Sequence, residues 1–441
     1  LHDALHGTAV SSVVATMNDP FVMGKQACCR WLAALCLALP LVAFAEDSEP
    51  ALAPPETSVS GPRSGSLLGL TKADITGSVR GAYWSSNRLL DDRANLGTAS
   101  TWLKLDKRLD GGFGVFAEAY ASREDFRSDG NSNARFREAY LDARFGQLDV
   151  RLGKQIIAWG RADRLNPTDN LTPRDATLLA ADIDEDRFGA VAAKASWNFT
   201  ASTSLTTVWL PSFQPNRIAM RNGMREQVPD DQRNWAIKLD QSGKAIDWSV
   251  SYYEGRDLSG DLGADFVLRH YRNRVIGADA ATTVGPWRFA LESAYTRTED
   301  PNGSIPFLKN PFVYTVFGVE RDFGDNTNAI VQLFNRTVLN YQQPSGAAQL
   351  HAILTSQLDR TQNGVSVRIA KKWMNETLET ELSGLRLFER NGYSIRPRMV
   401  YLWSDQIKLL AGYEYFNGSS DTIYGLLHAN STLFAEMRFY F

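Results

Sequence analysis

The sequence is 441 residues long, 44% hydrophobic and 11% aromatic, and it has a formal net charge of -3 at pH 7. Its Lys and Arg residues are scattered rather than clustered, which argues against a nucleic-acid partner. Beyond residue 45 no apolar run reaches the roughly 18 residues that a membrane-spanning helix needs, so a helical membrane protein is excluded.

The first part of the chain predicts export from the cytoplasm. Residues 1–22 begin with Leu and precede Met23, and we interpret them as an upstream extension from a mis-called start. Residues 23–45 contain the basic Lys25 and Arg30, then an apolar stretch, then small residues up to Ala45, which is the pattern of a cleaved signal peptide. The alternative, a single anchoring helix, fits less well because the apolar stretch is short.

The next segment predicts a flexible leader. Residues 46–72 are rich in Pro, Ser and Glu and too poor in apolar residues to fold alone, so we expect a flexible periplasmic leader. The three cysteines of the sequence all lie before it: Cys28, Cys29 and Cys36. The processed chain is therefore expected to contain no thiol, although disulfides are permitted in the compartment it enters.

Residues 73–441 show the period of two that is typical of β-strands. Leu103 and Leu105 lie on one face of a predicted strand, and Lys104 and Asp106 lie on the other. A soluble sandwich would turn the apolar face inward, whereas a transmembrane barrel turns it toward lipid and lines its lumen with the polar face. Alternation alone does not separate the two folds.

The connections between the strands favour the barrel. Short turns are predicted at residues 109–112, 145–147, 198–200, 241–244, 284–286, 323–325, 375–376 and 404–406. Longer connections are predicted at residues 86–97, 124–133, 159–187, 211–232, 255–272, 298–310, 337–362, 389–393 and 417–430. This alternation predicts an all-β, transmembrane antiparallel β-barrel of about 18 strands, with short periplasmic turns and long external loops.

The last strand predicts how the barrel enters the membrane. The stretch TLFAEMRFYF alternates in polarity and ends on Phe441, and it resembles the terminal strand of bacterial outer-membrane proteins. That resemblance implies recognition of Phe441 by the barrel-assembly machinery. The expected location is the outer membrane of a Gram-negative bacterium, with the bilayer and lipopolysaccharide as partners. Monomeric and homo-trimeric forms both remain open.

The longest connection, residues 159–187, is the candidate functional segment. Pro167 and Pro173 exclude a helix or a spanning strand there, and the many Asn, Thr and Asp residues favour an ordered loop. A charged external loop that folds into the lumen can act as the constriction of a pore. The predicted constriction residues are Arg161, Asp163, Arg164, Asp169, Arg174 and Asp175. The alternative is a solvated loop that faces lipopolysaccharide.

The polar faces of the predicted strands give a set of lumen-lining residues with both signs of charge. They are Arg80, Lys104, Asp106, Arg108, Glu138, Asp142, Arg144, Glu379, Glu381, Lys408 and Glu414. This mixture favours diffusion of small solutes over a uniformly basic export channel for an anionic polymer.

One stretch resembles a known family. The run LGKQIIAWGRADRLNPTDNLTPRD is similar to a segment of a largely uncharacterised proteobacterial family of porin-like outer-membrane proteins. The matching residues are Gly153, Lys154, Gln155, Trp159, Gly160, Asn166, Pro167 and Asp169. The resemblance implies an outer-membrane barrel and leaves the solute open.

These observations together predict a passive, porin-like channel for small polar or charged solutes, with selectivity set by residues 159–187. Export of an anionic polymer and transport of apolar solutes are the alternatives. An enzyme is not expected, because the histidines after residue 45 lie outside any catalytic motif and in or beside predicted loops, where we expect them to be solvated: His270, His351 and His428. We expect no metal or other cofactor.

Overall fold

The computed structural model describes residues 74–86, 94–125, 132–163, 165–218, 224–230, 233–243 and 245–441. The upstream extension 1–22, the signal peptide 23–45 and the leader 46–72 lie outside the described residues, as does Arg164 of the predicted constriction. These assignments therefore stay predictions.

Eighteen long strands form one antiparallel sheet. They are β1 (Ile75–Ser86), β2 (Ala94–Leu109), β3 (Phe113–Glu124), β4 (Ser132–Phe145), β5 (Leu148–Gln155), β6 (Ala190–Asn198), β7 (Thr203–Leu210), β9 (Asn234–Gln241), β10 (Asp247–Arg256), β13 (Arg272–Val284), β14 (Trp287–Arg297), β15 (Phe312–Asp322), β16 (Thr327–Val338), β17 (Thr361–Trp373), β18 (Leu378–Leu387), β19 (Gly392–Ser404), β20 (Ile407–Gly418) and β21 (Thr432–Tyr440).

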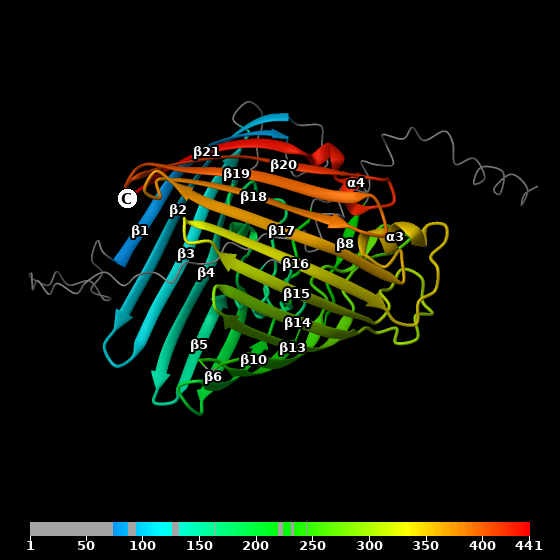
Figure 1. Ribbon diagram of the computed structural model, residues 1–441. Coiled ribbons are helices and arrows are strands. Elements are labelled where there is room, and N and C mark those ends of the chain that lie inside the picture. Colours follow the sequence, from blue (N-terminus) through cyan, green and yellow to red (C-terminus); the bar gives the residue numbers. More distant parts are fainter. Residues whose placement is uncertain are drawn as a thin grey trace, which may run out of the picture.

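The sheet closes into a barrel (Figure 1). Each strand pairs with the strands that precede and follow it in the wall, and β1 also pairs with β21, with Ser78 opposite Tyr440 and Trp84 opposite Phe434. Short turns gather at one end of the barrel and long connections at the other, as the turn pattern predicts. The predicted fold class and strand number are confirmed.

The two faces of the wall differ in polarity. Outward side chains form an exposed apolar surface, to which Leu141, Ile276 and Leu382 contribute, each more than half exposed. Bulky aromatic residues lie beside the short turns, at one edge of this apolar surface. They include Phe145, Trp197, Trp248, Trp287, Trp373 and Trp403. Inward positions carry mostly polar or charged side chains, which is the polarity pattern of a transmembrane barrel.

The long connections pack on one another at their end of the barrel. They contain a small sheet of β8 (Arg225–Gln227), β11 (Asp261–Leu262) and β12 (Val267–Arg269), with the helices α3 (Ala348–Leu354) and α4 (Ile423–Leu426) and the 3-10 helix η3 (His428–Asn430). An apolar cluster joins them: Ile218, Met224, Leu262, Leu268, Leu354, Leu426 and Leu427. Within the described ranges, no helix combines the length and apolar character needed to cross a membrane.

Candidate functional site: the lumenal loop

The connection between β5 and β6, residues 156–189, lies inside the barrel. β5 ends at Gln155, three residues before the predicted end at Ala158, and the chain then turns into the lumen. The two ends of the first half of this lumenal loop meet at Ile157 and Thr172, a contact that we call the neck. The Ile157 amide donates a hydrogen bond to Thr172 Oγ1, and the Thr172 hydroxyl donates to the Ile157 carbonyl, each at 2.8 Å. We call residues 157–172 the first lobe and residues 173–188 the second lobe.

The first lobe is held by carboxylates of the barrel wall. Arg161 pairs with Asp279 of β13 and, at 3.0 Å, with Asp240 of β9. Glu292 of β14 is fully buried and accepts hydrogen bonds from both the amide and the hydroxyl of Thr168 at 2.8 Å. The amides of Arg161 and Ala162 donate to the same carboxylate at 3.2 Å. A buried carboxylate needs such partners, so Glu292 fixes the lobe in one position.

Tight backbone packing requires glycine at the start of this lobe. Gly160 has a φ of 103°, and a Cβ there would lie 2.5 Å from a carboxylate oxygen of Glu292 and 1.7 Å from the Asn166 side chain. A side chain at residue 160 would therefore push the lobe off the wall. The neighbouring Trp159 packs in an apolar cluster with residues of β6, β7, β9, β10, β13 and β14.

The second lobe is held by guanidinium groups on the opposite side of the lumen. Asp182 pairs with Arg398 of β19 at 2.5 Å and with Arg438 of β21 at 2.7 Å. Glu185, in the 3-10 helix η2 (Ile183–Asp186), pairs with Arg80 of β1 at 2.7 Å. Burial alone would raise the pKa of Asp182, but Arg438 and Arg398 lower that pKa to about 2. The carboxylate is therefore ionised at neutral pH.

A third group of contacts connects the second lobe to β4. Asp175 is buried and pairs with Arg135 at 2.9 Å and with Arg217 at 3.2 Å. Arg137 donates to the carbonyls of Asp184 and Arg187, at 2.8 and 2.9 Å. A β-bulge at this point in β4, where Glu118 faces Glu138 and Ala119 faces Phe136, lets both arginines turn inward.

The predicted constriction residues that the structure describes all lie in this loop, and they pair both with the barrel wall and with other residues of the loop. Arg161 contacts the barrel wall, Arg174 pairs with Asp186 at 2.9 Å, and Asp169 pairs with Arg187 at 2.7 Å. Asp163 is half-buried in the first lobe. Their role in selecting solutes is a matter for the proposal below.

The predicted lumen-lining residues occupy inward positions of their strands. Several form ion pairs between strands. Arg368–Glu381, Arg398–Glu379 and Arg396–Glu414 join neighbouring strands, and Arg108–Asp142 joins β2 to β4 across β3. Lys104 lies over the Phe116 ring, and Glu138 accepts from the Ile156 amide. Asp106 and Lys408 share the inward faces of β2 and β20 with Lys104 and Glu414.

The sequence-based set omitted the wall residues that hold the loop. They are Asp240, Asp279, Glu292, Arg135, Arg137, Arg396, Arg398 and Arg438. The period of two could have placed most of them on the inward face of their strands, but the β-bulge in β4 breaks that period at Arg135 and Arg137. Nothing in the sequence indicates which of them meet the loop.

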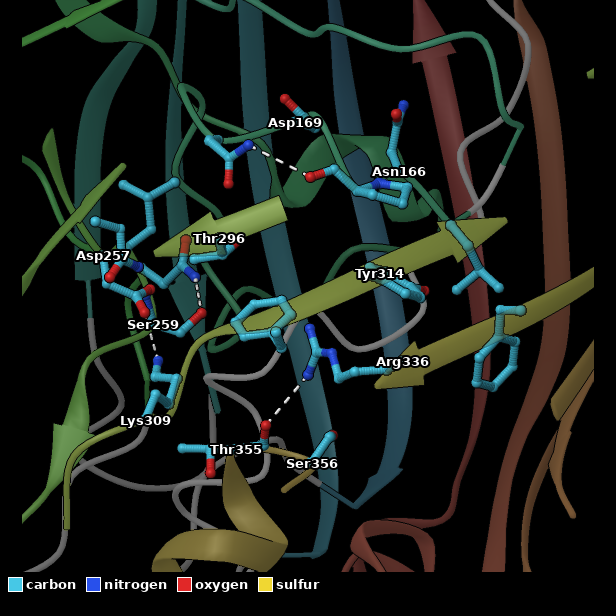
Figure 2. Close-up of a pocket in the computed structure, with 18 of the residues that line it drawn as sticks. Asn166, Asp169, Asp257, Ser259, Thr296, Lys309, Tyr314, Arg336, Thr355 and Ser356 are labelled. Atoms are coloured by element: carbon cyan, nitrogen blue, oxygen red, sulfur yellow. Dashed lines mark hydrogen bonds and ion pairs between the residues drawn. The ribbon is translucent and has the colours of Figure 1, made fainter. Parts of the chain in front are cut away.

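Among the cavities that the described residues form in the lumen, two have room for a small molecule. One of about 630 Å³ lies near the short turns and is lined by four cations and two carboxylates: Arg108, Arg144, Arg151, Lys194, Asp142 and Asp149. The other, of about 220 Å³, lies among the first lobe, β14 to β18 and the long connections (Figure 2). Its charged lining residues are again four cations and two carboxylates: Arg174, Arg256, Lys309, Arg336, Asp169 and Asp257. Both cavities therefore carry an excess of two positive charges.

The predicted solvation of the histidines is wrong for two of them. His270 and His351 are buried; His270 contacts Glu226 and the Asp257 carbonyl, and His351 contacts Asp261 at 2.8 Å. They are enclosed because the long connections pack against each other. In the part of the chain that the structure describes, no group of three or more His, Cys, Asp or Glu side chains is placed to hold a metal ion.

Known proteins share the fold at low sequence identity. The barrel is similar to OccAB3 of Acinetobacter baumannii, with a TM-score of 0.53 and 10% identity over 84% of this chain and 99% of that one. It is also similar to OccD3 (OpdP) of Pseudomonas aeruginosa, with a TM-score of 0.52 and 11% identity over 83% and 91% of the two chains. A comparison with curated proteins gave no match. Residues 63–397 match the family described as "Protein of unknown function (DUF1302)", and the chain belongs to that family.

Proposed function

We propose that this protein is a porin-like channel of the bacterial outer membrane through which small polar or charged solutes diffuse passively. The exposed apolar outer face, the aromatic residues beside the short turns and the polar lumen support a membrane location. In this proposal residues 23–45 direct export, the long connections face lipopolysaccharide and Phe441 engages the barrel-assembly machinery. Monomer and trimer both fit the proposal.

The lumenal loop is the proposed selectivity element. The observation that carries this proposal is that its two lobes are fixed to different parts of the wall by charge: Arg161 and the Glu292 contacts hold one, and Asp182 and Glu185 hold the other. A loop fixed across the lumen reduces the open cross-section. Charges in a narrow passage are poorly screened, so they act strongly on a passing ion.

The structure allows the first lobe to be removed without opening the barrel. Ile157 and Thr172 already contact one another at the neck, so residues 159–170 can be replaced by Gly-Gly. Glu292→Gln is combined with this change, because a buried carboxyl group that loses its hydrogen-bond partners would be strongly destabilising. We expect a higher single-channel conductance in planar bilayers and a reversal potential nearer to zero in a salt gradient.

The controls separate constriction from other effects. Glu292→Gln alone reports the effect of the wall substitution, and circular dichroism reports whether the barrel is folded. The difference in selectivity between the wild type and the shortened variant should be smaller in 1 M salt, where the screening length is about 3 Å. Equal conductance and reversal potential in the two folded proteins would reject the loop as a constriction. Absence of current from both would reject the channel.

A further inference from the structure

Arg336, on the inward face of β16, differs from the arginines that hold the lumenal loop. Its Nη1 donates to the Thr355 carbonyl at 3.1 Å, whereas its Nε is buried without a hydrogen-bond partner. Among the described residues, no carboxylate lies within 4.0 Å of it. Arg161 and Arg398, by contrast, pair with carboxylates. Arg336 therefore keeps donors available for an acceptor that the protein itself does not supply.

Two aromatic rings hold the Arg336 guanidinium at the edge of the 220 Å³ cavity. Its central carbon lies 4.5 Å from the ring centre of Phe312 and 5.0 Å from that of Tyr314. Figure 2 shows Arg336 reaching from β16 toward the middle of the lining residues, with Thr355 and Ser356 beyond it. Cation–π contacts of this kind offset part of the cost of burying the charge and do not use the in-plane donors of the guanidinium.

The rest of the cavity is suited to a compact, partly apolar molecule. Phe334, Leu385 and Leu387 line it together with Tyr314. Its volume of about 220 Å³ corresponds to about seven water molecules at about 30 Å³ each. This is below the range of about 300–1,000 Å³ that is typical of sites for drug-sized ligands. A molecule with one ring therefore approaches the upper size limit.

The charges around the cavity select for an anion. The other three cations are paired: Lys309 with Asp257 at 2.5 Å, Arg174 with Asp186 and Arg256 with Glu299. Arg336 therefore supplies the positive charge that no neighbour neutralises. A carboxylate can accept two parallel hydrogen bonds from one guanidinium, and such charge-assisted bonds are roughly twice as strong as neutral ones.

We propose that this cavity is a binding site for a small organic anion, with its carboxylate on Arg336 and its single ring against Tyr314, Phe334 and Leu385. The proposal deepens the proposed channel function by naming the class of solute, and it rests on that function for the route into the cavity. Binding itself does not require that the barrel conduct.

The test uses benzoate as the probe and isothermal titration calorimetry of the folded barrel in detergent. We expect Arg336→Gln to weaken benzoate binding at least tenfold, which corresponds to about 1.4 kcal/mol. Arg151→Gln is the matched control, because Arg151 is an inward arginine of β5 that also lies over an aromatic ring, Tyr140, and lines the other cavity. Benzamide, which has the same ring but no charge, should bind more weakly than benzoate to the wild type and equally to both variants.

A ligand series keeps the test independent of any effect of the substitution on folding. With the wild type, benzoate should bind more tightly than acetate, which lacks the ring, and more tightly than 2-naphthoate, which exceeds the cavity. Equal binding of benzoate to the wild type and Arg336→Gln, or no binding to the wild type, would overturn the proposal. Arg336-dependent binding to a barrel that passes no current would reject the channel function and retain the site.

Discussion

Single side chains decide where the lumenal loop lies. Glu292 accepts four hydrogen bonds from the first lobe, and Asp182 receives two guanidinium groups from the second. Both carboxylates are buried, so removing one partner of such a contact leaves the remaining polar group without a hydrogen bond. Such losses cost more than surface ion pairs contribute, because the remaining polar group has also lost its contact with water.

At the residue scale, we predict that Glu292→Ala releases the first lobe. Three backbone amides lose their acceptor, and each unpaired buried donor costs about 1–3 kcal/mol. Hydrogen exchange measured by mass spectrometry should be at least tenfold faster in residues 161–168 and unchanged in β15. Glu254→Ala is the control, because Glu254 contacts Tyr252 and Arg274 and not the loop. Unchanged protection of residues 161–168 would show that Glu292 does not hold the lobe.

At the scale of elements, the neck divides the lumenal loop into two lobes that pack on different strands. The first lobe belongs to an apolar cluster with β6, β7, β9, β10, β13 and β14, and the second to clusters with β1, β2, β3, β19, β20 and β21. Each lobe therefore has both an apolar and a charged attachment. This arrangement favours a fixed loop over a mobile one, because several independent contacts must break together before a lobe moves.

We predict that a covalent link between the first lobe and β13 leaves conduction unchanged. An ideal Cβ at Gly277 would lie 3.3 Å from the Cβ of Thr168, close to the roughly 3.5–4.5 Å range of disulfides. The double variant Thr168→Cys with Gly277→Cys should oxidise readily and show the same conductance with and without reductant. The single variant Thr168→Cys controls for the added thiol. A conductance that falls on oxidation would instead indicate that the lobe moves when solutes pass.

Local patterns in the sequence account for the barrel better than for the site. Alternation and turn residues act between neighbouring residues, so the strands and their short turns could be predicted. The pair Asp182–Arg398 joins residues 216 apart, on a loop and on a distant strand. Such contacts depend on how far the loop reaches across the lumen, which no local pattern records. The burial of His351 was missed for the same reason, since its partner Asp261 lies in another long connection.

Throughout the barrel, polar side chains that face inward alternate with apolar side chains that face outward along each strand. On β20, Lys408 and Glu414 face inward, whereas Leu409, Ala411 and Tyr413 face outward. A shift of one residue would exchange these faces, so the register is strongly specified. This distribution is that of a wall between an apolar phase and an aqueous one.

We therefore predict that Ala411→Arg destabilises the barrel in a bilayer by about 2–4 kcal/mol, provided that the residue lies near the midplane. Lys408→Gln should change stability little, because Lys408 lies on the inward face of β20, where its environment is polar. Urea titration of the protein folded into liposomes measures both. If Lys408→Gln were the more destabilising change, the assigned faces of β20 would be reversed.

The seam between β1 and β21 has a consequence for the order of assembly. Every other contact in the wall joins strands that are close in sequence, so these can form hairpin by hairpin. The seam brings together Ser85 and Thr432, which are 347 residues apart, and its last hydrogen bonds link Gly77 to Phe441. The entropic cost of closing a loop grows with its length, so this contact forms late. Until then both edge strands expose unpaired backbone groups, so the open barrel is prone to pair with other chains.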